Sequence, residues 1–151
     1  MKKLSGYTLI ELLVAITVIS IVFAIGYASF REFSRRQALT GIVRSVTSDL
    51  RLAQQLSLTG EKPETGSCTT LEGYSFAPNS GNYTVTANCS NADRLIKTVT
   101  LESGVTISGP TVQFKVLGQG TNLNSTATLT INHSVLGNSV TITVGKGGEV
   151  K

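Results

Sequence analysis

The sequence has few of the residues from which catalytic and metal sites are usually built. Its 151 residues include no Trp, one His, two Cys and three Pro, and charged side chains make up 15%. His133 has no acidic pair near it in the sequence, so we expect a turn residue rather than a metal ligand. No serine stands in a Ser-His-acid pattern. We therefore expect a protein that is not an enzyme and has no cofactor and no metal site.

The glycine-rich segments also lack the spacing of a phosphate-binding loop. Residues 118–120 and 145–148 do not follow the G-x-x-x-x-G-K-[ST] pattern, and no helical pattern adjoins them. We expect both segments to be turns.

The net charge of +4 is partly local. Lys2 and Lys3 precede a long apolar run, and Arg31, Arg35 and Arg36 follow it. Such modest basicity fits an anionic membrane surface or weak nucleic-acid contact, and it requires neither.

The apolar run is long enough to cross a bilayer. Residues 7–30 contain one charged side chain, Glu11, and the 19 residues 12–30 contain none. A cleaved secretory signal would have a shorter apolar stretch followed by an Ala-x-Ala-like cleavage site. Here the helical pattern continues instead, which favours a membrane-spanning helix.

Beyond residue 30 the pattern becomes amphipathic. Apolar residues recur at steps of three and four, as on one face of a helix. They are Leu39, Ile42, Val43, Val46, Leu50, Ala53 and Leu56. Charged residues fall largely between them, Asp49 included. Since no Pro interrupts residues 7–58, we predict one helix of about 50 residues, roughly 75–80 Å long, with Gly60 as its C-cap.

After Pro63 the period of the pattern changes to two, which is typical of strands. The predicted strands cover residues 73–78, 82–88, 95–102, 105–108, 111–117, 126–132 and 138–145. Alternating Thr and Val indicate a sheet with one buried face, and the amphipathic half of the helix can cover that face. We predict an α+β fold: a long N-terminal helix, apolar and then amphipathic, packed on a C-terminal antiparallel β-sheet head.

Two cysteines, Cys68 and Cys89, lie in this head. No Cys or His cluster stands beside them, which argues against zinc. In an exported domain we expect one disulfide, closing a loop of about 22 residues and stabilising the fold by about 3 kcal/mol. In a reducing cytosol the same residues would be two unpaired thiols.

The stretch GYTLIELLVAI, residues 6–16, resembles the N-terminal signature of type IV pilins and of the pseudopilins of type II secretion systems. The resemblance implies that prepilin peptidase removes a basic leader by cutting after Gly6 and N-methylates Tyr7. The family's glutamate at the fifth position after the cut corresponds to Glu11.

The resemblance also implies the pilin fold and its division of the chain. Residues 1–6 would be the prepilin leader, 7–30 the membrane-spanning and filament-core half of the helix, 31–59 its amphipathic half, and 60–151 the globular head. The implied partners are other pilin or pseudopilin subunits, prepilin peptidase, the inner-membrane assembly platform and, before assembly, membrane lipid. The implied location is the bacterial inner membrane, with the N-terminus inside and the head outside, and then an extracytoplasmic filament.

Physical reasoning gives Glu11 a role in assembly. A charge near the bilayer centre costs on the order of 3 kcal/mol, and no Lys or Arg lies within a helical turn or two. The nearest cation is the amine that cleavage would create at Tyr7, in the same chain or in a staggered neighbour. Pairing between neighbours would fix their axial register and, repeated without closure, would give a helical filament. The alternative is a Glu near the membrane interface that is hydrated or protonated.

Two further features indicate which group within the family the chain resembles. The C-terminal part, with its Gly148-Glu149-Val150 ending, is similar to the GspH/FimT-like group of minor pilins and pseudopilins. Many type IV pilins have a helix-kinking Pro where this chain has Ala28, so a minor or pseudopilin subunit is favoured over a major one.

Two alternatives remain. One is a FimT-like DNA-binding pilin, with Lys146 and Lys151 as the DNA contacts. The other is an uncleaved single-span membrane protein that displays a β-rich binding head.

Overall fold

The computed structural model describes residues 8–64 and 66–151. The predicted leader, Gly6 and Tyr7 lie outside the described residues. The chain divides into two compact units, Met1–Ala38 and Leu39–Lys151.

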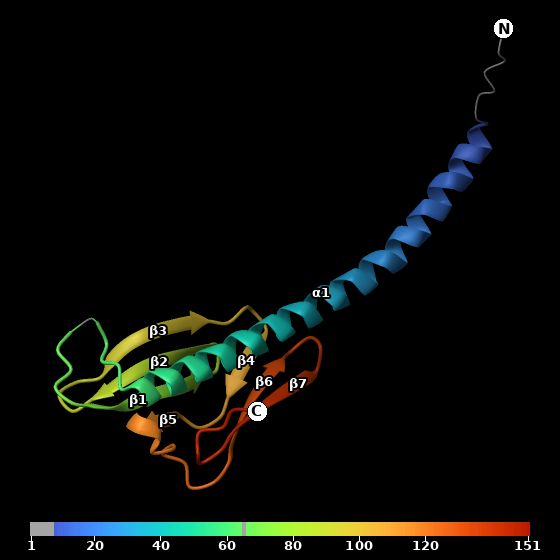
Figure 1. Cartoon of the computed structure of the whole chain (residues 1–151). Helices are drawn as coiled ribbons and strands as arrows, with labels where there is room; N and C mark the ends of the chain where they lie inside the picture. The colour runs from blue at the N-terminus through green and yellow to red at the C-terminus, as the bar shows by residue number, and fades with distance from the viewer. Residues whose placement is uncertain (1–7, 65) are drawn as a thin grey trace. The chain divides into compact units, whose positions relative to one another are not determined.

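The predicted long helix is confirmed as α1, Leu9–Thr59 (Figure 1). At its start the Thr8 Oγ1 accepts a hydrogen bond of 3.3 Å from the Glu11 backbone N–H, so Thr8 is the N-cap. At its end Gly60 has a φ of +66°, a left-handed conformation that ends helices and that Gly adopts without strain.

The predicted antiparallel β head is also confirmed. The described strands are β1 Leu71–Asn79, β2 Asn82–Cys89, β3 Arg94–Thr100, β4 Val105–Ser108, β5 Val112–Lys115, β6 Ala127–His133 and β7 Asn138–Val144, with a 3₁₀ turn η1 at Val116–Gly118. They are divided between two sheets, with strand orders β3-β2-β1-β5 and β4-β6-β7, rather than joined in one. Every pairing between these strands is antiparallel.

The core of the second unit lies between α1 and the sheets. From the predicted apolar face of the helix, Val46, Leu50 and Ala53 are fully buried. They belong to one cluster with side chains of both sheets, among them Phe76 and Leu129. Burial of this amphipathic face supplies the hydrophobic free energy that holds residues 39–59 on the head.

Candidate functional site

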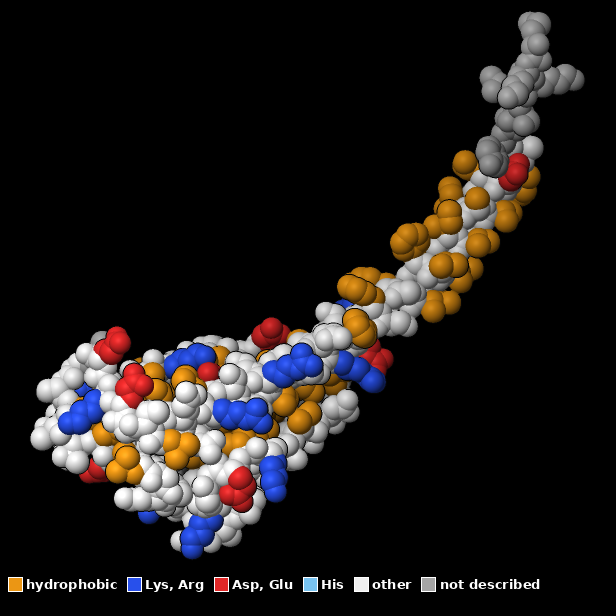
Figure 2. Space-filling view, viewed as in Figure 1, with side chains coloured by type: hydrophobic (Ala, Val, Ile, Leu, Met, Phe, Trp, Pro, Cys, Tyr) orange, Lys and Arg blue, Asp and Glu red, His pale blue; other side chains and the backbone are white. Residues whose placement is uncertain are grey.

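The first unit carries the apolar half of α1. Every large apolar side chain described from Leu9 to Phe33 is at least half exposed within the chain, from 51% at Leu13 to 82% at Leu9. Figure 2 shows hydrophobic side chains along this segment. An 18-residue window of the helix has a mean hydropathy of 2.6 and is 0% buried, so by length and composition the helix can cross a membrane.

Glu11 lies in the first turn of this helix and is exposed. The ion pairs of the described residues join Arg36 to Glu32 and Lys97 to Asp49, and neither includes Glu11. Its position three residues after the N-cap makes Thr8-Leu9-Ile10-Glu11 a capping-box sequence. A carboxylate in the first helical turn is also favoured by the helix dipole. This local role was readable from the T-x-x-E spacing, and our sequence interpretation missed it.

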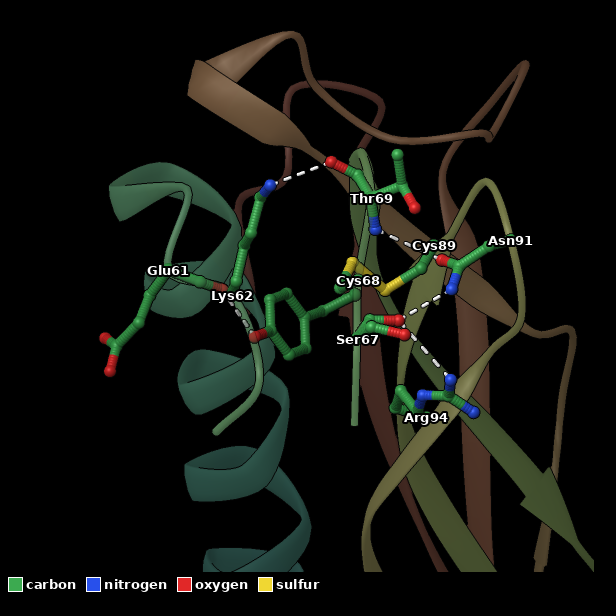
Figure 3. The surroundings of a disulfide bond; sticks show 9 residues. Glu61, Lys62, Ser67, Cys68, Thr69, Cys89, Asn91 and Arg94 are labelled. Carbon is green, nitrogen blue, oxygen red and sulfur yellow. Dashed lines mark hydrogen bonds between the residues drawn. A yellow bond between two sulfur atoms is a disulfide. The ribbon is translucent and has the colours of Figure 1, made fainter. Parts of the chain in front are cut away.

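The structure joins the two cysteines in a disulfide. The Cys68 and Cys89 sulfurs are 2.06 Å apart, and the bond links the segment after α1 to the last residue of β2 (Figure 3). Asn91 makes two hydrogen bonds to the same segment. Its Oδ1 accepts a 3.2 Å hydrogen bond from the Thr69 N–H, and its Nδ2 donates a 2.6 Å hydrogen bond to the Ser67 carbonyl. The segment is therefore fixed by covalent and polar contacts together.

The other residues singled out in the sequence lie in the head. His133 ends β6, is buried, and its Nδ1 accepts a 3.2 Å hydrogen bond from the Val135 N–H. Across residues 8–64 and 66–151 no His, Cys, Asp or Glu cluster of metal-binding composition occurs.

The C-terminal residues extend the sheet beside β7. Lys151 and Thr143 exchange backbone hydrogen bonds of 2.9 Å, and Val150 bridges Val144. Lys146 is exposed in the turn between these segments. DNA contact at Lys146 and Lys151 stays a prediction.

A buried polar cluster was not predicted from the sequence. Asp49, expected among the charged residues between the apolar positions of the helix, is only 4% exposed. Its Oδ1 lies 2.8 Å from the Lys97 Nζ, and its Oδ2 accepts a 2.7 Å hydrogen bond from the Tyr83 hydroxyl. The Ser45 hydroxyl lies 3.2 Å from the Tyr83 hydroxyl. The cluster links α1 to β2 and β3, and these long-range partners satisfy the buried carboxylate.

Burial in this cluster raises the pKa of Tyr83 to about 12, and the neighbouring Asp49 carboxylate contributes to the rise. The Ser45 hydroxyl acts in the opposite direction. Tyr83 is therefore a neutral hydrogen-bond donor at any physiological pH.

Comparison with protein families finds a match at the N-terminus of the chain. The model of the prokaryotic N-terminal methylation motif matches residues 1–27, a range that includes Gly6, Tyr7 and Glu11. No curated protein and no solved structure matches the chain. The chain thus carries the N-terminal signal of a type IV pilin-like or pseudopilin prepilin.

Proposed function

We propose that this protein is a structural subunit, of the minor pilin or pseudopilin kind, in a type IV pilus-like or type II secretion filament. The observation that carries the proposal is that a family motif and an uncovered apolar helix occur together at the N-terminus. The methylation motif covers a helix segment whose apolar side chains are uncovered within the described chain and whose one charge is Glu11. Such a segment needs lipid before assembly and other copies of the protein after it.

Maturation would begin at the membrane. Prepilin peptidase cuts after Gly6, creates an amine at Tyr7 and methylates it, while residues 7–30 hold the subunit in the inner membrane. The N-terminus lies inside and the head of residues 60–151 outside. The assembly platform then lifts the subunit into the filament, where Glu11 of one copy pairs with the Tyr7 amine of the next. This pairing avoids the free-energy cost of burying an isolated charge, and it fixes the axial stagger of neighbouring copies.

The uninterrupted helix supports the minor or pseudopilin kind. α1 continues through position 28, where many type IV pilins have Pro, and stays helical from Leu9 to Thr59. A helix that keeps its backbone hydrogen bonds here has less tendency to unwind locally than one with Pro.

The mass of the intact membrane-extracted protein tests the processing step. We expect loss of residues 1–6 and the addition of one methyl group in cells that contain prepilin peptidase. A Gly6→Val variant, which places a branched side chain at the cut, is the matched control and should keep its full mass. Retention of Met1 throughout the wild-type membrane pool would contradict the proposal and favour the uncleaved single-span protein.

A further inference from the structure

A pocket of about 280 Å³ opens on the head between the end of α1, the segment that follows it and β3. Its apolar lining comes from Leu56, Pro63, Tyr74, Leu95 and Ile96. We call it the docking pocket. Every lining residue belongs to the second unit.

A β-bulge exposes two of these apolar side chains. The β2–β3 register passes from Val85 opposite Lys97 to Thr86 opposite Leu95, which leaves Ile96 as the extra residue. Bulges redirect side chains, and here Leu95 is 61% and Ile96 37% exposed. Because β3 is an edge strand of its sheet, these side chains stand where another molecule can reach them.

The wall opposite β3 is held in place before any partner binds. The Tyr74 hydroxyl donates a 2.6 Å hydrogen bond to the Glu61 carbonyl. The Lys62 Nζ donates to the Thr69 carbonyl at 2.8 Å, next to the Cys68–Cys89 disulfide (Figure 3). A site that is already ordered loses less conformational entropy on binding, so the docking pocket is suited to specific recognition.

The charges around the docking pocket indicate what it accepts. Glu61 and Glu64 line it and are exposed. Lys62 also lines it, but its ammonium is engaged with the Thr69 carbonyl. An apolar floor with carboxylates at its rim fits a large apolar side chain that is flanked by cations.

The chain itself carries such a segment at residues 30–36, FREFSRR, which we call the basic segment. Phe30 is 66% and Phe33 59% exposed, and among the described residues the exposed aromatic side chains all lie between positions 23 and 33. Arg31 and Arg35 flank Phe33. The Arg31 guanidinium lies 5.7 Å from the centroid of the Tyr27 ring, and Arg36 pairs with Glu32 within the segment.

We propose that the docking pocket of one copy receives the basic segment of a second copy, with Phe33 on the apolar floor and its arginines near Glu61 and Glu64. This inference rests on the proposed function, since it names the head surface through which filament subunits meet. The contact is heterologous, because it joins different surfaces of the two copies. Repeated without closure, it propagates a filament.

Charge reversal tests the contact. In cells that assemble the filament, a Glu61→Arg/Glu64→Arg variant should be incorporated about tenfold less than wild type, because like charges then face each other. Adding Arg31→Glu/Arg35→Glu to the same chain should restore incorporation. Glu102→Arg, an exposed acidic position outside the docking pocket, is the control and should assemble normally. Equal melting temperatures of the purified full-length variants would exclude misfolding as the cause.

Cysteine cross-linking tests the geometry directly. Phe33→Cys and Leu95→Cys chains, mixed in one filament, should form an intermolecular disulfide under mild oxidation, whereas Phe33→Cys with Val135→Cys should not. Normal incorporation of the Glu61→Arg/Glu64→Arg variant, or no Phe33–Leu95 cross-link within filaments, would overturn the docking proposal. Neither result would contradict the filament function itself, which fails if wild-type protein keeps Met1 throughout the membrane pool or is never incorporated.

Discussion

Asp49 is a buried carboxylate whose two oxygens have different partners, the Lys97 ammonium and the Tyr83 hydroxyl. A buried charge without partners would cost far more than these contacts contribute, so the cluster fixes which part of α1 faces β2 and β3. Its partners lie 34 and 48 residues away in the sequence. Helical periodicity around Asp49 could not identify them.

Tyr83 makes the stability of the head depend on alkaline pH. Its pKa is raised from 10.0 in the unfolded chain to about 12 in the folded one, so its contribution is complete below pH 10 and is lost as the pH rises toward 12. Tyr83→Phe should cost about 1 kcal/mol at pH 7, through the lost hydrogen bond. It should also flatten the decline of unfolding free energy between pH 9 and 11.5, measured by denaturant titration of the detergent-solubilised protein. An unchanged decline in the variant would contradict this role, and exposed Tyr27→Phe serves as the control.

Glu11 lies in the capping-box sequence at the helix start, and the proposed function gives it a separate role in assembly. Glu11→Ala should insert into the membrane normally, since it removes a charge that costs on the order of 3 kcal/mol there, but it should fail to enter filaments. Thr8→Ala is the matched control. It removes the N-cap at a cost of about 1 kcal/mol but keeps the carboxylate, so incorporation should persist. Wild-type incorporation of Glu11→Ala, measured by immunoblot of sheared filaments, would refute the register role.

At the scale of the elements, β1 has no room for added atoms at Gly73. It lies between β2 and β5, and a Cβ placed on Gly73 would lie 2.1 Å from the Phe114 carbonyl oxygen of β5. Gly73 also has a φ of +156°, which L-residues rarely adopt. Gly73→Ala should therefore destabilise the head by about 1–3 kcal/mol, measured by thermal or urea unfolding. Gly81→Ala is the control, because nothing lies within 4 Å of its added Cβ. Equal stability of the two variants would show that β1 and β5 can separate without cost.

Strand positions were predictable because alternation is a local property, and a hairpin of β1 and β2 was predictable from the short turn between them, but pairings between strands distant in the sequence were not. The prediction for residues 105–108 matches β4, whereas the one for residues 111–117 ends as β5 at Lys115. There the chain enters a 3₁₀ turn in which Leu117 adopts a φ of 54°. The same alternation serves either sheet, so the division into two sheets and the bulge at Ile96 follow from long-range register that the sequence pattern does not contain.

In the molecule as a whole, the sequence predicted the long helix and the β head, because each depends on a continuous stretch of chain, whereas the assembly role of Glu11 stays a prediction. The boundary between the two units could not be predicted from the sequence, because helical periodicity continues through Ala38 and Leu39 without a break. The docking pocket could not be predicted from the sequence either. It is built from the end of α1, the following segment, β1 and β3, which meet only in the folded head.

The position of the disulfide affects when the wall of the docking pocket gains its covalent tie to β2. Cys68 lies in the stretch between α1 and β1 that also supplies Glu61, Lys62 and Pro63 to the docking pocket. Inside a reducing cytosol this stretch would lack its covalent tie to β2, and it would gain that tie only once an oxidising compartment is reached. The proposed docking pocket would then be completed only in that oxidising compartment.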